Sequence, residues 1–225
     1  KELKFLGGLG QVNIKTCYNY NEEAVNELTM NADIVFNLIG VLFEKKSASF
    51  NKVHSEIPRM IAKSCKLNDV KKFIHLSALG VNKNFQSKYA ISKYTGERNI
   101  IKEFPNVVII RPSVVFGNED NFVNLFSKMS NFSPILPIIG TPKITSGKSF
   151  FPNINFKSGV NFQPVYVGDL ADFIISSSFE EKKVYDLAGP GIVSFRMIIE
   201  LILKLRKRKR ICIPVPLFMA RLAAF

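Results

Sequence analysis

Residues 75–97 read HLSALGVNKNFQSKYAISKYTGE, and the pattern in this stretch decides the fold. The stretch opens at the end of an apolar run, Lys72–Ser77, which is typical of a buried strand, and a polar loop and a helix follow. Tyr89 and Lys93 are four residues apart, so on a helix they share one face. We expect the Lys93 ammonium to lie near the Tyr89 phenol and to lower its pKa, because a cation stabilises phenolate. Ser77, where the strand ends, is placed to hydrogen-bond a substrate oxygen beside Tyr89.

This serine, followed by Tyr-x-x-x-Lys, resembles the catalytic triad of the short-chain dehydrogenase/reductase superfamily. The resemblance implies catalytic roles for Ser77, Tyr89 and Lys93. Tyrosine and lysine at this spacing also occur on ordinary half-buried helices, so the flanking sequence matters. Three flanking strings resemble, in order, the superfamily's fourth strand, its R-P-x-x-V-(Y/F)-G loop beside the nicotinamide, and its V-x-D step from strand to helix: Asp33–Gly40, Arg111–Gly117 and Gln163–Leu170.

Several further strings of the sequence resemble a narrower family. The chain resembles the NAD(P)H-binding accessory subunit of respiratory complex I (NADH:ubiquinone oxidoreductase), the 39 kDa type, and its α-proteobacterial relatives. The resemblance covers the chain except for residues 141–161, which we interpret as an insertion. The strings that carry it are Asn37–Glu44, Lys72–Ser77, Phe116–Asp120, Phe132–Pro137 and Phe162–Val167.

The family resemblance implies a tightly held NADPH, and the cofactor is expected to be NADP(H) or NAD(H). No metal site is expected, because the cysteines have no metal-binding spacing. Residues 37–40 would line the cofactor, Tyr89 and Lys93 would contact its ribose and nicotinamide side, and residues 112–114 would close over the nicotinamide. By match of motif, the implied cofactor-binding residues are therefore Asn37, Leu38, Ile39, Gly40, Tyr89, Lys93, Pro112, Ser113 and Val114.

Strands and helices alternate along the chain, which favours an α/β fold with a doubly wound parallel sheet of the Rossmann type. Strands are expected at 12–16, 33–40, 72–77, 107–112, 163–167 and 184–188. Helices are expected after Asn21, over 50–67 with a kink at Pro58, and at 121–130, 169–179 and 194–207. A long loop is expected over 133–161. We interpret residues 1–225 as one incomplete NAD(P)-binding domain, with a core of 12–118 and 162–188 and a small C-terminal subdomain of 119–161 and 189–225.

One part of the superfamily pattern has no match in this sequence. The family opens with a strand and a Gly-rich turn that place the pyrophosphate at a helix N-terminus. Residues 7–10, GGLG, lack the flanking strand and helix, so we do not assign them to this turn. The match begins at the family's third strand, and relatives continue beyond Phe225. The chain is therefore expected to lack the first two strands, to be truncated at both ends, and by itself to fold incompletely and bind NAD(P)H poorly.

The formal net charge is +13, which predicts attraction to anions such as nucleotides, acidic lipids or nucleic acid. Six cations fall in the seven residues Lys204–Arg210. They are either a solvated helix end or a contact with an anionic membrane, where each contributes ~1 kcal/mol. Residues 211–225 are apolar enough for an interfacial helix. No nucleic-acid partner is expected, because interleaved aromatic residues and a known nucleic-acid-binding module are both lacking.

The location is inferred from cysteines and hydropathy. The three cysteines are far apart, and they indicate a reducing compartment rather than disulfides. No apolar run reaches about 18 residues. We expect a cytoplasmic protein, peripheral on the inner face of the bacterial plasma membrane, or on the matrix side in mitochondria.

Single residues have plainer interpretations. His75 is expected to be a packed core histidine, and His54 a partly exposed helix residue. Cys65 is expected in the core, and Asp169 is expected to cap its helix rather than act on a substrate.

The favoured function is a non-catalytic NAD(P)H-binding accessory or assembly subunit of complex I or of related quinone machinery, with complex I subunits or quinone-biosynthesis proteins as partners. The alternative is an active NAD(P)-dependent reductase or epimerase, of the kind linked to ubiquinone biosynthesis, that uses Ser77, Tyr89 and Lys93.

Overall fold

The computed structural model describes residue 8 and residues 11–81, 87–140, 143–145, 153–155, 159–175 and 183–216. The chain divides into two compact units. The first consists of Lys1–Arg111 with Phe179–Tyr185, and the second of Pro112–Ser178 with Asp186–Phe225. The residues that the sequence singles out are divided between these two units.

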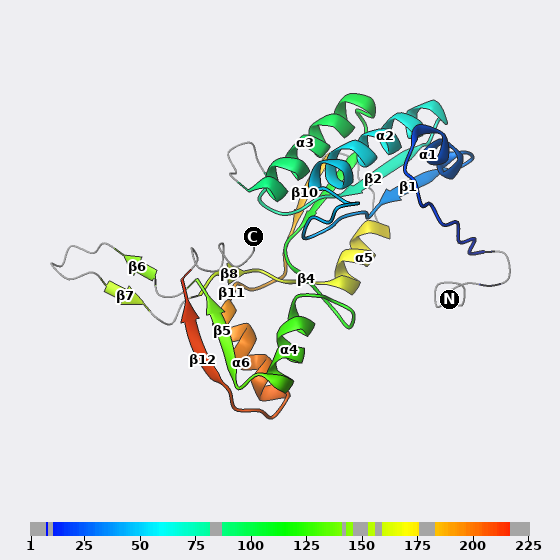
Figure 1. The fold of residues 1–225 in the computed structure, drawn as a ribbon. Helices are drawn as coiled ribbons and strands as arrows, with labels where there is room; N and C mark the ends of the chain where they lie inside the picture. Colours follow the sequence, from blue (N-terminus) through cyan, green and yellow to red (C-terminus); the bar gives the residue numbers. More distant parts are fainter. Residues whose placement is uncertain are drawn as a thin grey trace. The chain divides into compact units, whose positions relative to one another are not determined.

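The first unit is built on a four-stranded sheet with the order β1-β2-β3-β10. The pairs β1–β2 and β2–β3 are parallel, and Asn37 lies opposite His75 in the first of them. This arrangement confirms the predicted α/β fold with a parallel sheet (Figure 1). Its elements are α1 (Glu22–Thr29), β1 (Ile34–Asn37), η2 (Lys52–Glu56), α2 (Ile57–Leu67), β2 (Lys72–Leu76), α3 (Lys88–Glu103), β3 (Val108–Pro112) and β10 (Val184–Leu187).

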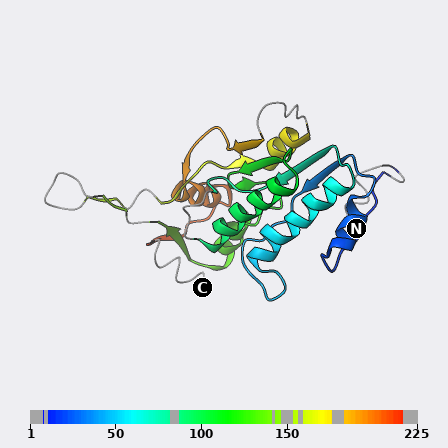
Figure 2. The same ribbon diagram turned by 90° about the horizontal axis from the view of Figure 1, so that it is seen from above.

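Helices α2 and α3 lie side by side on one face of this sheet (Figures 1 and 2). Strands β1, β2 and β3 are neighbours in chain order, and right-handed crossovers between them place both connecting helices on the same face. Alternate strand residues point at the helices. Phe73 of β2 and Ile109 of β3 are fully buried there against Ile57 and Ile61 of α2. This side of the sheet is therefore the core of the first unit.

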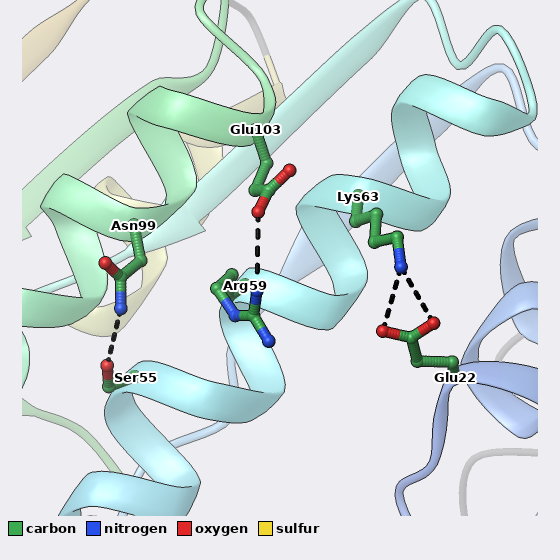
Figure 3. Close-up of polar contacts among 6 residues, drawn as sticks. All are labelled: Glu22, Ser55, Arg59, Lys63, Asn99 and Glu103. Carbon is green, nitrogen blue, oxygen red and sulfur yellow. Dashed lines mark hydrogen bonds and ion pairs between the residues drawn. The ribbon is translucent and has the colours of Figure 1, made fainter.

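Polar contacts set how the helices of the first unit meet (Figure 3). Lys63 of α2 donates to both carboxylate oxygens of Glu22 in α1, at 2.9 and 2.8 Å. Asn99 of α3 donates to the hydroxyl of Ser55 in η2 at 3.0 Å. The Lys63–Glu22 pair is exposed, so it matters more for orientation than for free energy, whereas the bond from Asn99 reaches the buried Ser55.

The helix predicted over 50–67 contains a π-helical turn, η2, immediately before α2. Pro58 has no N–H to donate to the carbonyl of His54, and the N–H of Ile57 bonds instead to Lys52 five residues back. The kink at Pro58 stays a prediction. Gly96 of α3 packs against the π-helical turn so closely that a Cβ would lie 1.8 Å from the His54 oxygen.

In the described part of the second unit, helices α4 and α6 pack on short strand pairs, and α5 follows β9. Strands β5 and β12 pair in parallel, as do β4 and β9, while β8–β11 and β6–β7 are antiparallel. Its core joins Phe126 of α4, Leu136 of β5 and Phe195 of α6. The elements are β4 (Val115–Phe116), α4 (Val123–Phe132), β5 (Ile135–Ile139), β6 (Lys143–Thr145), β7 (Asn153–Asn155), β8 (Asn161–Phe162), β9 (Val165–Tyr166), α5 (Val167–Ile175), β11 (Val193–Ser194), α6 (Phe195–Leu205) and β12 (Ile211–Val215).

Three expected elements differ in the structure. Residues 12–16 are not a strand; most of their side chains are exposed and they pair with no neighbour among the described residues. The expectation of a long loop over 133–161 is wrong, because β5, β6 and β7 lie within this range and Leu136 of β5 is fully buried. The interfacial helix expected from residue 211 is also wrong, because Ile211–Val215 form β12 beside β5. Residues 217–225 lie outside the described part of the chain.

Several helix starts are confirmed. Asn21 accepts the N–H of Ala24 at 2.8 Å, and Ser194 accepts that of Met197 at 3.2 Å, so both residues cap the helices that were expected to start there. The expectation that Asp169 caps its helix is wrong, because α5 begins at Val167 and Asp169 lies within its first turn. Among the described residues, no helix has both the length and the apolar character needed to cross a bilayer.

Candidate functional site

The site begins where β1 and β2 end side by side. Asn37 and His75 are paired in the sheet register and are fully buried, with 3.0 Å between Asn37 Nδ2 and His75 Nδ1. Asn37 Oδ1 accepts the N–H of Ile39 at 3.1 Å, which fixes the direction of the amide. Asn37 Nδ2 therefore donates to His75 Nδ1, so the proton of the neutral imidazole sits on Nε2.

A second histidine contacts the loop that follows β1. The N–H of Val41 donates to His54 Nε2 at 3.1 Å. Because Nε2 accepts, the ring proton sits on Nδ1 and donates to Ser92 Oγ at 2.9 Å. Ser92 in turn donates to the carbonyl of Tyr89 at 2.8 Å. This chain of hydrogen bonds joins the loop after β1 to the first turns of α3.

Lys93 lies between that loop and the end of β2. Its side chain is buried, and Nζ donates to the carbonyl of Leu76 at 3.3 Å. A Cβ on Gly40 would lie 3.4 Å from Lys93 Nζ, so the glycine leaves room for the ammonium. Burial lowers the pKa of Lys93 to about 8, while the nearby Glu97 carboxylate acts in the opposite direction. Lys93 is thus a buried cation at neutral pH.

Glu97, one turn beyond Lys93, is held by Arg111 at the end of β3. The guanidinium donates to both carboxylate oxygens, Nε to Oε1 at 3.0 Å and Nη2 to Oε2 at 2.5 Å. The side chain of Glu97 is 3% exposed and that of Arg111 22%. A bidentate pair of this kind fixes geometry as well as charge, and it anchors α3 to the sheet.

Tyr89 lies in the first turn of α3, which Ser87 caps by accepting the N–H of Ala90 at 3.3 Å. Its ring is half-buried and meets the rings of Phe50 and His54 edge-on, with centroids 5.7 and 5.2 Å away. Burial raises the pKa of the Tyr89 phenol. The expectation that Lys93 lowers this pKa is wrong, because burial dominates and the ammonium is engaged with the end of β2.

Ser77 follows β2 and is buried. Its N–H donates to the carbonyl of Ile110 at 2.7 Å. Its hydroxyl has no hydrogen-bond partner in the described part of the chain, and the same holds for Nε2 of His75. Buried polar atoms without partners are uncommon in folded proteins and mark places where a water or a ligand atom is expected.

The structure therefore brings together, within the first unit, most of the residues that the sequence singled out. The end of β1 provides Asn37 and the loop after it provides residues 38–40. Ser77 follows β2, and α3 provides Tyr89 and Lys93. Residues 112–114 belong to the second unit. There the N–H of Ser113 donates to the carbonyl of Leu187 at 2.8 Å. Their role at the nicotinamide stays a prediction.

Sequence reasoning missed His54 and Ser92. His54 was expected to be partly exposed, and that is wrong, since it is fully buried. Its position three residues before Ile57 and seven before Ile61 puts it on the buried face of the helix, and this spacing was the available signal. The expectations for His75 and Cys65 are confirmed: both are fully buried, and burial raises the pKa of the Cys65 thiol to about 12.

No protein-family model matches the sequence. The chain is 30% identical over 219 residues to the mitochondrial NADH dehydrogenase (ubiquinone) 1 alpha subcomplex subunit 9 of Mus musculus, a match that covers 96% of this chain and 54% of the relative. The chain thus spans about half the length of the curated relatives it matches.

Two solved structures resemble the fold. The dTDP-4-dehydrorhamnose reductase of Clostridium acetobutylicum has a TM-score of 0.69 at 17% identity, and the UDP-glucose 4-epimerase of Thermus thermophilus, in complex with NAD, has 0.66 at 18%. Each alignment covers 87% of this chain and 70% of the other. With its parallel sheet and its match to the mouse protein, this chain is a homologue of the mitochondrial NADH dehydrogenase subunit over the half that it spans, and it has a Rossmann-type α/β fold.

Proposed function

We propose that the chain is the NAD(P)H-binding part of an accessory or assembly subunit of NADH:ubiquinone oxidoreductase or of related quinone machinery. The support is its homology to a subunit of that enzyme and the placement of Lys93. A buried ammonium between Gly40 and the carbonyl of Leu76 has donors left to reach the hydroxyl groups of a ribose.

The residues at the ends of β1 and β2 fit such a ligand. Gly40 has no side chain to fill the space above Lys93, and Leu38 is 59% exposed beside it. The unpartnered hydroxyl of Ser77 offers a donor or acceptor for a further polar atom. When bound, NAD(P)H would supply a hydride. The residues named here would bind and orient the dinucleotide.

Tyr89 is suited both to binding and to proton donation. Its pKa is raised by burial, so the phenol is protonated at neutral pH and can donate a hydrogen bond to a ligand or a proton to a substrate oxygen. The assignment as a binding subunit rests on the homology to a subunit of NADH:ubiquinone oxidoreductase. The alternative is an NAD(P)-dependent reductase or epimerase acting through Ser77, Tyr89 and Lys93, in which the protonated Tyr89 would serve as the proton donor.

The test is native mass spectrometry of the protein purified from its own cells. We expect a bound NADPH or NADH and copurifying subunits of NADH:ubiquinone oxidoreductase. Copurification with quinone-biosynthesis enzymes instead would move the assignment to that machinery. A protein without dinucleotide and without either set of partners would contradict the proposal, and turnover that depends on Tyr89 would establish the enzyme alternative.

Two features of the second unit favour a peripheral contact with an anionic membrane. The basic cluster Lys204–Arg210 begins in the last turn of α6 and continues beyond it, and its cations are exposed except for the half-buried Arg210. Met197, Leu201 and Leu205 recur every four residues on α6 and are 54%, 56% and 73% exposed. An exposed apolar stripe beside clustered cations complements an anionic bilayer, with the apolar side chains at the interface and the cations at the head groups. We propose that this surface holds the protein at the inner face of the membrane.

Liposome flotation tests the membrane surface. Binding should rise with the fraction of acidic lipid and fall with salt. A triple reversal, Lys207→Glu with Arg208→Glu and Lys209→Glu, should abolish it. A control that reverses three exposed lysines of the first unit, Lys46, Lys52 and Lys66, changes the net charge equally and should retain most of the binding. Equal loss in both triple variants, or no binding at all, would contradict a specific surface.

A further inference from the structure

The two histidines of the chain each hold one part of the segment Asn37–Val41. We propose that His54 and His75 are positioning residues that clamp this segment and thereby set the surface it offers to the ribose of NAD(P)H. The inference rests on the proposed function for its ligand, but the clamp itself is a property of the chain alone. It adds roles to two residues for which the superfamily resemblance assigns none.

The first clamp runs through His54. Its Nε2 accepts the N–H of Val41 and its Nδ1 donates to Ser92, so one ring connects the loop to α3. Ser92 passes the connection to the carbonyl of Tyr89. An imidazole suits this place because it accepts at one nitrogen and donates at the other while staying neutral. The loop and the turn that carries Tyr89 are thus positioned together.

Packing holds the His54 ring in one orientation. The ring stacks on Phe50, with centroids 5.4 Å apart and planes 18° apart, and meets Tyr89 edge-on. Gly96 packs directly on the His54 carbonyl, which fixes the backbone behind the ring. Burial and the charge of Lys93 lower the pKa of His54 to about 4, so Nε2 remains an acceptor at neutral pH.

The second clamp runs through His75. Its Nδ1 accepts from Asn37 Nδ2, and Asn37 Oδ1 accepts the N–H of Ile39. The two clamps therefore act on alternate residues of the loop, Ile39 and Val41. Both histidines are fully buried, so neither bond competes with bulk water.

Amide variants of the histidines separate the clamps from general packing. The Oε1 of glutamine falls near the place of a histidine Nε2, and the Oδ1 of asparagine near that of Nδ1. At position 54, where Nε2 is the acceptor, His54→Gln should preserve the clamp and His54→Asn should lose it. At position 75, where Nδ1 is the acceptor, the order reverses: His75→Asn should preserve the clamp and His75→Gln should lose it.

The primary readout is amide hydrogen exchange by NMR, measured on the whole chain without cofactor. The Val41 amide should exchange about tenfold faster in His54→Asn than in wild type or His54→Gln. The Ile39 amide should do the same in His75→Gln but not in His75→Asn. Ser64→Ala, which breaks a buried bond to Thr29 in the same unit, is the control for general loosening and should change neither amide selectively.

NADPH affinity is the second readout. The two clamp-losing variants should bind about tenfold more weakly, and the two clamp-preserving variants within about threefold of wild type. If wild type binds no NADPH, the proposed function fails while the exchange data still decide the clamp. Equal exchange for glutamine and asparagine at each position, or the same order at both positions, would overturn the inference. The reversed order cannot arise from lost stability alone, so a partly destabilised variant still yields a decision.

Discussion

Acid should destabilise this protein through its two histidines, and the effect can be worked out from the structure. The chain contains only His54 and His75, and both are fully buried. Burial, with the charge of Lys93, lowers the pKa of His54 to about 4 and that of His75 to about 3, against 6.5 for a free imidazole. Below pH 6.5 the unfolded chain therefore binds protons that the folded chain does not.

The sign follows from this difference. The unfolded state binds more protons, so a fall in pH stabilises it relative to the folded state. The free energy of unfolding therefore decreases between pH 6.5 and about 4. From pH 7 to pH 5 each histidine accounts for about 2 kcal/mol, and the pair for about 4 kcal/mol. Lys93 adds little in this window, because with a pKa of about 8 it is largely protonated in both states. Against a typical stability of about 5–15 kcal/mol this loss is large.

The assay is urea unfolding followed by circular dichroism at pH 7, 6 and 5, since the chain has no tryptophan. His54→Gln, which keeps the acceptor for Val41, should reduce the loss to about 2 kcal/mol. In NMR spectra neither imidazole of the folded wild type should titrate between pH 7 and 5. Titration of either ring near pH 6.5, or a stability that does not change over this range, would contradict the predicted loss.

Two further predictions concern how α3 is held. Gly96→Ala should lower the free energy of unfolding by about 3 kcal/mol or more, because the new Cβ would collide with the backbone oxygen of His54. The control is Gly191→Ala, at a position with open space around it. This control should change the free energy of unfolding by less than about 0.5 kcal/mol in the same urea titrations. Glu97→Ala should cost about 1–3 kcal/mol, because it removes the buried bidentate carboxylate that holds Arg111. The same change at the exposed Glu22 should have little effect. Similar losses at the two positions would contradict the anchoring role of Glu97.

Local patterns in the sequence were enough to predict the parallel sheet and the placement of the central residues. Buried parallel strands read as apolar runs, and spacing of four put Tyr89 and Lys93 on one helix face. The strands Ile135–Ile139 and Ile211–Val215 were missed because each is stabilised by the other, more than 70 residues away along the chain. Neither has a local signal that outweighs its prolines and short length.

The chemistry of the site was harder to predict than its residues. Spacing on a helix suggested that Lys93 lowers the pKa of Tyr89, but a pKa depends on burial and on where the ammonium points. Both are set by packing against β2 and the loop at Gly40. The role of His54 depends likewise on a π turn that brings its ring under Val41, and a turn of that kind follows from contacts with Gly96 as much as from Pro58.

The most direct test of the account is calorimetric titration of the chain with NADPH, for wild type, Lys93→Ala and Lys63→Ala. Lys63 is an exposed lysine of the same unit that pairs with Glu22, so it controls for the loss of a charge. We expect saturable binding with a Kd above about 1 μM, because the sequence shows no Gly-rich turn for the pyrophosphate. Lys93→Ala should weaken this binding at least about tenfold, since it removes a charged donor, and Lys63→Ala should leave it unchanged. An affinity that is the same for wild type and Lys93→Ala would contradict the placement of the cofactor beside Lys93.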